Sequence, residues 1–378
     1  MPFNGLAVYS SGQFNTLAED VSSIVGMISP HETIFLDALS QPERAAQSVL
    51  HEWLDEKLSP DTVSTSIQLL PAGTDFSPHV SGTAVAGYMR AGAVLENERT
   101  GEHVQIAAIT GNTVTLTRGF ASTTAATVNV GDTFFVIADA ANEGDDVSRD
   151  TTRPRSRSLN YVQLIKKDVI VSGTRSAVRN LGSIEDEFAH QKNMRIKEAL
   201  RDLEKAVLRS RLSGNTIGGS AVEEARTMNG LYHMITTNVT STGTMTPDVL
   251  DTIIEGAWDQ GGTDLNLIVA GKAWKRVIDN FNSSRSQVIQ GGTGDELYKR
   301  LVTHYTGTYG DFEVQLNRNM PDSSLLVVST ERVHVVPLEG RSFQFEKTAK
   351  TGDAEKGMLV GEYTVEVHNE EGLAKAYG

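Results

Sequence analysis

Residues 183–212 carry the repeat of one long amphipathic helix. Apolar residues recur there at intervals of four, three and four positions, which places them on one helical face. These residues are Ile196, Leu200, Leu203 and Val207. Ser183, with Asp186 three positions later, forms a capping-box arrangement at the start. At 1.5 Å per residue the helix spans about 45 Å, so we predict a structural spine with this stripe as its buried core.

The segment at residues 59–158 has a different pattern, typical of antiparallel strands. VQIAAITGNTVTLTRGF places β-branched residues on both sides of Gly111-Asn112, and TVNVGDTFFVIADA repeats the arrangement around Gly131-Asp132. Short apolar runs separated by such turns indicate hairpins. We predict a small all-β barrel or sandwich at residues 80–140.

Helix and strand patterns are mixed in the rest of the chain. Strand-like NYVQLIKKDVIVSGT precedes the long helix. After residue 246, helices at residues 248–258 and 272–281 alternate with strands at 264–270, 312–316, 325–329, 333–336 and 363–368. This irregular order favours an α+β fold over a repeated βαβ fold.

The first 58 residues form a loosely patterned arm with scattered aromatic residues. Chain termini are loose unless contacts hold them. Phe3, Phe14 and Trp53 are therefore candidate anchors that dock on a neighbouring subunit.

A charge cluster follows the β-rich segment. The acidic members are Glu143, Asp145 and Asp146, and the basic members are Arg149, Arg153, Arg155 and Arg157. The cluster lacks the interleaved aromatic residues of a single-strand nucleic-acid site. A solvated loop is one interpretation. We favour intersubunit contacts in which guanidinium groups meet carboxylates.

A search for catalytic, cofactor or metal-binding motifs finds none. The chain has no cysteine, which excludes disulfides and thiolate ligands and fits a reducing cytoplasm. His31-Glu32 and His51-Glu52 do not extend to the H-E-x-x-H zinc motif, and Gly291-Gly292-Thr293-Gly294 lacks the Lys-Ser/Thr of a P-loop. We expect no enzyme activity and no cofactor.

Charge and hydropathy limit the remaining classes. The formal net charge is −14, which opposes tight DNA binding over most of the surface. If DNA is near, the protein should enclose it without sequence-specific binding. Apolar stretches are too short to cross a bilayer, and the first residues lack the pattern of a secretion signal. We expect no membrane association.

In their order along the chain, several stretches resemble the tailed-bacteriophage major capsid proteins of the Hong Kong 97-like fold. The resemblance covers nearly the whole chain. It is carried by ISPHETIFLDAL, HEWLDEKL, NYVQLIKKDVIVSGTRSAVRNLG, NRNMPDSSLLVV and FEKTAKTGDAEKGMLVGEYTVEVHNEEGLAKAYG.

The resemblance implies a domain plan. Residues 1–58 would be the N-terminal arm, and residues 59–158 the extended E-loop with the 80–140 β domain inserted in it. Residues 159–245 would form the peripheral (P) domain with spine helix 183–212, and residues 246–338 the axial (A) domain. Residues 339–378 would return to the P domain. Some members carry an added domain in the E-loop, and others do not.

The resemblance also implies a function. The chain would self-assemble as hexamers and pentamers into an icosahedral head shell around double-stranded DNA. Portal and scaffolding proteins would be its partners, with decoration proteins as further candidates. It would be located in the virion capsid and assembled in the host bacterial cytoplasm. Alternatives are an encapsulin-like cellular compartment, a tail or decoration protein, and a soluble hydrolase with an unrecognised site.

Some members of the fold join a lysine on the E-loop to an asparagine of an adjacent subunit. Here no lysine lies between Lys57 and Lys166. Arginine stays protonated and is a poor nucleophile. We therefore expect a shell that is held together without covalent crosslinks.

Overall fold

The chain folds into two compact units. Unit 1 combines Met1–Leu54 with Arg157–Gly378, and unit 2 is Asp55–Ser156. The computed structural model describes residues 33–39, 44–56, 58, 61–80, 83–84, 89–140, 155–178, 186–214, 225–281, 304–350 and 352–378. Phe3, Phe14, Glu143, Asp145, Asp146, Arg149 and Arg153 lie outside the described residues. Each unit is described by itself.

The longest helix of unit 1 is α3, at Glu187–Arg209. Its N-cap is Asp186, whose side chain accepts hydrogen bonds from the backbone N–H groups of Phe188 and Ala189. The prediction of Ser183 as the cap is therefore wrong, and the helix is shorter than residues 183–212 at both ends. Asp186 has extended backbone angles, which an N-cap requires and an interior helical residue does not have.

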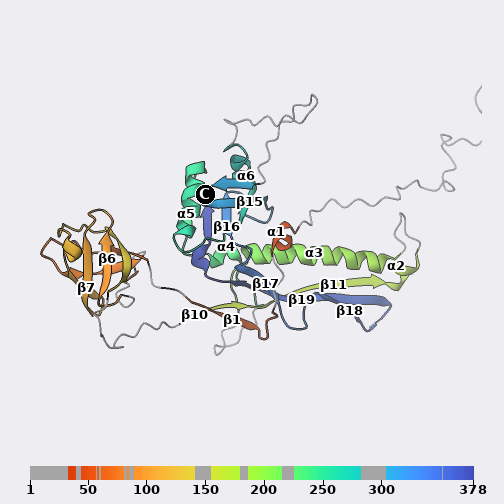
Figure 1. Ribbon diagram of the computed structural model, residues 1–378. Helices are drawn as coiled ribbons and strands as arrows, with labels where there is room; N and C mark the ends of the chain where they lie inside the picture. Colours follow the sequence, from red (N-terminus) through yellow and green to blue (C-terminus); the bar gives the residue numbers. More distant parts are fainter. Residues whose placement is uncertain are drawn as a thin grey trace, which may run out of the picture. The chain divides into compact units, whose positions relative to one another are not determined.

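The apolar stripe of α3 is buried only in part. Leu203 and Val207 are buried, whereas Ile196 is half-buried and Leu200 is 36% exposed. The inclusion of Leu200 in the buried core is thus corrected. Because α3 rests on strands β11 and β19 along one side, as Figure 1 shows, the sheet covers only part of the stripe. Ala199 completes the buried face.

The sheet under α3 has four strands. Its members are β11 (Gln163–Ser172), β17 (Val333–Pro337), β18 (Gln344–Thr348) and β19 (Ala354–Val367). β11 pairs antiparallel with one edge of β19, from Gln163↔Tyr363 to Ser172↔Ala354. β17 and β18 follow one another along the other edge. The long strand β19 therefore organises this layer.

A second, six-stranded sheet in unit 1 has the order β12-β20-β16-β13-β15-β14. In chain order these strands are β12 (Val239–Ser241), β13 (Leu267–Ala270), β14 (His304–Gly307), β15 (Gly310–Leu316), β16 (Ser324–Val328) and β20 (Ala374–Tyr377). Every residue of β13 and β16 is buried. Helix α5 (Pro247–Trp258) packs against β20, and α6 (Lys272–Ile278) packs against β15, so the apolar strands lie within the main core.

Sheet membership does not follow the expected boundary between residues 338 and 339. β17 belongs to the predicted A region in sequence, yet it pairs with β19 in the sheet under α3. β20 is in the predicted return to the P domain, yet it pairs with β16. The C-terminal segment thus contributes to both sheets, because strand pairing joins segments that are distant in the chain.

Short elements complete unit 1 and its link to unit 2. The helices are α1 (Ile34–Ala38), α2 (Gly173–Ala177), α4 (Leu231–Met234) and the 3-10 turn η5 (Glu370–Gly372). Strands β1 (Leu50–Asp55) and β10 (Ser156–Tyr161) pair as a two-stranded sheet. Among the described residues, no helix is long and apolar enough to cross a membrane.

Unit 2 contains an eight-stranded antiparallel sheet with the order β3-β8-β7-β6-β9-β2-β4-β5. Its strands are β2 (Thr62–Thr65), β3 (Asp75–Phe76), β4 (Pro78–Val80), β5 (Thr83–Ala84), β6 (Ala93–Asn97), β7 (His103–Thr110), β8 (Thr113–Thr117) and β9 (Thr133–Asp139). The 3-10 turn η3 (Phe120–Ser122) follows β8. Since β2 and β3 precede residue 80, the sheet starts earlier than expected. The inserted domain itself stays a prediction.

One of the two predicted hairpins is confirmed. β7 and β8 pair across a turn at Gly111, whose φ of +60° is favourable for glycine. The second is wrong. β9 follows the turn at Gly131 but pairs with β2 and β6, while Val128 before the turn bridges to Leu69. The turn therefore joins segments with different partners.

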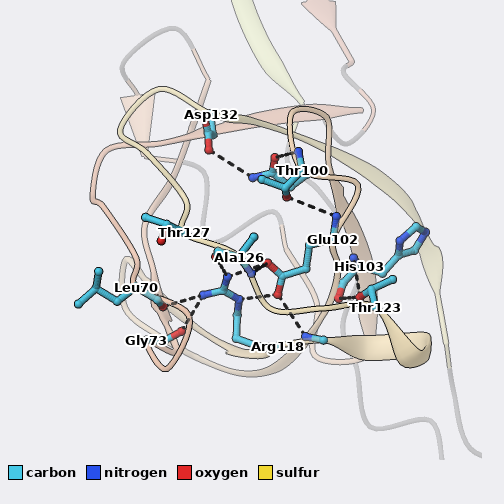
Figure 2. Close-up of polar contacts among 12 residues, drawn as sticks. Leu70, Gly73, Thr100, Glu102, His103, Arg118, Thr123, Ala126, Thr127 and Asp132 are labelled. Carbon is cyan, nitrogen blue, oxygen red and sulfur yellow. Dashed lines mark hydrogen bonds and ion pairs between the residues drawn. The ribbon is translucent and has the colours of Figure 1, made fainter.

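A buried ion pair connects the loops of unit 2 (Figure 2). Arg118 donates from Nε and Nη2 to the two carboxylate oxygens of Glu102, at 2.8 and 2.7 Å. The two side chains are 6% and 0% exposed. Arg118 also donates to the carbonyl oxygens of Leu70 and Gly73. Glu102 accepts from the backbone N–H of Gly119 and of Ala126, so this one pair binds three loop segments together.

The charge state of Glu102 follows from these contacts. Burial by itself raises the pKa of the carboxyl group, but the hydrogen bonds from Arg118, Ala126 and Gly119 outweigh it and leave the pKa below its ordinary value. The carboxylate is therefore ionised at neutral pH, and its charge is balanced by Arg118.

Candidate functional site

Arg155 and Arg157, which flank the end of unit 2 at Ser156, have carboxylate partners within the chain. Arg155 Nε lies 3.4 Å from Glu56 Oε2, and Arg157 Nη1 lies 3.5 Å from Glu52 Oε1. Both arginine side chains are more than 60% exposed, so each pair contributes at most about 1 kcal/mol. Sequence reasoning missed Glu52 and Glu56. The role of these arginines in intersubunit contacts stays a prediction.

Trp53 is an internal anchor, which corrects its assignment as an intersubunit contact. Its side chain is buried, and the indole N–H donates to the carbonyl oxygen of Val367 at 2.9 Å. An indole ring that is covered and hydrogen-bonded in its own chain has little surface left for a neighbour. Trp53 instead fixes β1 to the end of β19.

Histidines surround Glu366 next to this anchor. His51 Nε2 lies 3.0 Å from one carboxylate oxygen of Glu366, and His368 Nε2 lies 3.0 Å from the other. The hydrogen bond with His51 holds the pKa of Glu366 below its ordinary value, against the effect of burial. Within the described ranges, no group of three or more His, Cys, Asp or Glu side chains is arranged to hold a metal ion. The contact between His51 and Glu366 joins β1 to β19.

A second buried carboxylate, Glu204, lies on α3. Its Oε1 atom accepts hydrogen bonds from the side-chain amides of Asn317 at 2.6 Å and Asn319 at 3.1 Å. Burial raises the pKa of Glu204 although these amides lower it. The side chain is 1% exposed. The contact joins α3 to the segment after β15.

Glu204 also lines a cavity of about 250 Å³, together with Ile34, Arg201, Lys205, Asn317, Arg318 and Asn319. Sequence reasoning missed this residue, because a glutamate in an amphipathic helix is normally solvated. The stretch NRNMPD, quoted above for its resemblance, contains both asparagines. This stretch was the only sequence signal for the contact, but its residues do not indicate that it packs against α3.

None of these geometries assembles a nucleophile, a general base and an oxyanion site in the described part of the chain. They are structural contacts that hold the arm segment and the loops in place. Exposed apolar residues are present as well. Leu164 and Ile170, which are 47% and 66% exposed, lie on the side of β11 that α3 does not cover. Lys166 and Asp168 are exposed between them on the same side, so these two apolar residues do not form a continuous patch.

Comparison with known proteins gives a family match and distant structural likenesses. No curated protein sequence matches the chain. The capsid of Myoviridae phage XM1 is similar at 9% identity over 95% of this chain and 96% of that chain, with a TM-score of 0.48. The cyanophage A-1(L) capsid has 8% identity over 64% and 84%, with a TM-score of 0.47. Microbacterium phage Oxtober96 has 12% identity over 96% and 95%, with a TM-score of 0.43.

TM-scores below 0.5 support no detailed alignment, so the assignment rests on the family model. The model described as SU10 major capsid protein matches residues 8–378. This match confirms the resemblance to phage major capsid proteins and the expected role as a head shell protein. The mixed helices and strands fit the α+β capsid fold. The chain belongs to the SU10 major capsid protein family.

Proposed function

We propose that this capsid protein assembles through hexamers and pentamers into an icosahedral shell, which encloses the double-stranded DNA of a tailed bacteriophage without covalent crosslinks. The observation that carries the proposal is the family match over residues 8–378. Membership in a major capsid family implies self-assembly into a shell. The hexamers and pentamers, the icosahedral shape and the absence of crosslinks belong to the proposal.

The subunit surface supports repeated association. β11 has Leu164 and Ile170 exposed on its open side, and burial of such side chains against a neighbour is favourable by about 25 cal/mol per Å² of apolar area. Many contacts of modest strength give a durable closed lattice, because each subunit is held at several places at once. The E-loop assignment of residues 59–158, with its inserted β domain, is part of the same proposal.

Partners and location follow from the proposed role. We infer a portal protein and a scaffolding protein as partners, with a decoration protein as a further candidate. We also infer assembly in the host cytoplasm, with the mature protein in the virion capsid. We also infer that the protein has no enzymatic function, in agreement with a family of structural proteins.

Negative-stain microscopy of the purified protein, together with size-exclusion chromatography and light scattering, tests the proposal. Closed shells or rings of subunits are the expected result. A species that stays monomeric at high concentration would contradict it. Shells that contain a co-purified cargo enzyme instead of DNA would favour an encapsulin-like compartment, and turnover by a monomer would favour a hydrolase.

A further inference from the structure

The outward side of α3 carries a row of cations in a chain that is acidic overall. Lys197, Arg201, Lys205 and Arg209 follow one another at intervals of four residues. This spacing keeps neighbours on adjoining parts of one helical face over about 18 Å. The exposed positions of α3 are Ala189, Asn193, Lys197, Leu200, Lys205 and Arg209. None of them is acidic and none is aromatic.

Asp202 lies 3.9 Å from Arg201, but the acidic residues of α3 form no described ion pair with the other members of this row. Glu187 pairs with Arg175, Glu198 with Arg195, and Asp202 with Lys167 on β11. Glu204 points inward to the two asparagines. Lys197, Lys205 and Arg209 consequently have no ion-pair partner among the residues that the structure describes.

Further cationic groups widen the surface. Arg201, Lys205 and Arg318 line the cavity beside Glu204. The Nε atom of Arg201 is buried without a hydrogen-bond partner within the described residues, and the carboxylate of Asp202 lies 3.9 Å from it. At the end of the helix, Arg211 adds another exposed guanidinium. The arrangement therefore offers several N–H donors and no competing carboxylate on the exposed positions.

The composition of this surface discriminates between two kinds of partner. The centres of protein–protein interfaces are enriched in aromatic residues and arginine and depleted in lysine. The exposed positions of α3 include two lysines and no aromatic residue, so they fit such a centre poorly although Arg209 is among them. Contacts to a nucleic-acid backbone, in contrast, are made by lysine and arginine and need no apolar anchor. A shell that encloses DNA has the phosphate backbone of that DNA at its inner face.

We propose that the exposed face of α3, formed by Lys197, Lys205 and Arg209, contacts the phosphate backbone of the DNA inside the shell. The inference rests on the proposed function in one respect, namely that the shell encloses DNA. The contact is independent of base sequence, because only phosphates are engaged. It is also weak, because the rest of a chain with net charge −14 repels the duplex.

The first experiment measures binding of unassembled full-length subunits to a fluorescein-labelled DNA duplex by anisotropy, from 50 to 300 mM salt. The test variant is Lys197→Gln/Lys205→Gln/Arg209→Gln. The matched control is Arg44→Gln/Arg276→Gln/Lys350→Gln, which removes three exposed cations that also lack described ion-pair partners. Circular dichroism and electron microscopy of each protein report folding and assembly.

We expect the α3 variant to bind about tenfold or more weakly at low salt, with the slope of log K against log salt reduced by roughly two to three. The control variant should bind as the unchanged protein does, apart from a small general loss. Equal binding by the two variants would overturn the proposal. A variant that binds DNA normally but no longer assembles would also overturn it, and would assign α3 to a second copy of the chain.

A second measurement uses DNA-filled heads. Formaldehyde followed by mass spectrometry should attach nucleotides to Lys197 and Lys205 and leave Lys350 unmodified by DNA. Attachment at Lys350 without attachment at α3 would place another face against the DNA. If the unchanged protein forms no shell at all, the proposed function fails, and the anisotropy result still decides whether α3 binds phosphate.

Discussion

The side-chain amide nitrogen of Asn317 lies 2.6 Å from Oε1 of Glu204, so a buried carboxylate in the C-terminal part of the spine helix is held by the loop that follows β15. Asn319 donates to the same oxygen. The contact links α3 to the six-stranded sheet by charge-assisted hydrogen bonds rather than by apolar packing alone. Its removal should affect the subunit as a whole.

Glu204→Ala should lower the free energy of unfolding by about 2–4 kcal/mol, because it leaves the buried amide of Asn317 and the half-buried amide of Asn319 without this acceptor. The isosteric Glu204→Gln keeps an acceptor oxygen and should cost much less. Urea titration of unassembled subunits at pH 7 measures both. A similar loss in the two variants would show that the carboxylate charge, and not its acceptor oxygen, holds the contact.

The unchanged protein and the Glu204→Gln variant together give a test of how stability depends on pH. Burial raises the pKa of Glu204 above its ordinary value of 4.5, so the folded state binds this proton more tightly than the unfolded state. The ionised group thus destabilises the fold above the raised pKa, and this cost disappears as the pH falls toward 4.5. The stability of the unchanged protein relative to Glu204→Gln should therefore rise on acidification. A difference that is constant with pH would contradict this.

Disruption of the buried pair Glu102–Arg118 should lower the stability of unit 2 strongly. Arg118→Met should lower the free energy of unfolding by about 3–5 kcal/mol, because it leaves Glu102 ionised and buried without a cation. Arg90→Met is the matched control, since Arg90 pairs with Asp139 at the surface with both side chains more than one third exposed. The control should lose about 1 kcal/mol or less. Thermal unfolding followed by circular dichroism compares them, and equal losses would mean that the buried pair is not important for stability.

Substitutions in the apolar stripe of α3 test which of its residues the sheet covers. Leu203→Asp introduces a charge at a position that is 4% exposed, and we expect a loss of about 4 kcal/mol or more and little soluble protein. Leu200→Asp, at a position that is 36% exposed, should leave the subunit folded with a loss of about 1 kcal/mol or less. Soluble yield and melting temperature measure the contrast. Failure of both variants to fold would mean that the sheet covers Leu200 as well.

Much of this architecture was predictable because it is local. The spacing of apolar residues in α3 predicts a helix whatever its apolar face packs against. The turn at Gly111 joins two neighbouring strands that pair with each other. The errors arise where partners are distant in the chain. Asn317 is 113 residues from Glu204, and Val367 is 314 residues from Trp53. When these distant contacts are not known, the sequence predicts that the buried glutamate is solvated and that the internal tryptophan contacts a neighbouring subunit.

Trp53 provides a direct test of arm docking. Trp53→Ala should lower the free energy of unfolding by about 3–5 kcal/mol, because a buried indole and its hydrogen bond to Val367 are lost. Trp258→Ala changes a tryptophan that is 47% exposed and should cost much less. Chemical unfolding monitored by the remaining tryptophan fluorescence compares the two. If Trp53→Ala changed assembly but not subunit stability, the original assignment of Trp53 to an intersubunit contact would be restored.

The absence of lysine between Lys57 and Lys166 predicts how the shell is held together. An isopeptide bond donated by residues 59–158, the proposed E-loop, needs a primary amine, and a guanidinium stays protonated and does not replace it. Disulfides are excluded because the chain has no cysteine. Boiled, denatured shells should therefore run on a gel as one band at the monomer mass, and high salt or mild denaturant should dissociate them reversibly. A ladder of dimers to hexamers on the same gel would contradict this, and mass spectrometry of the ladder would then identify the donor among lysines outside residues 59–158.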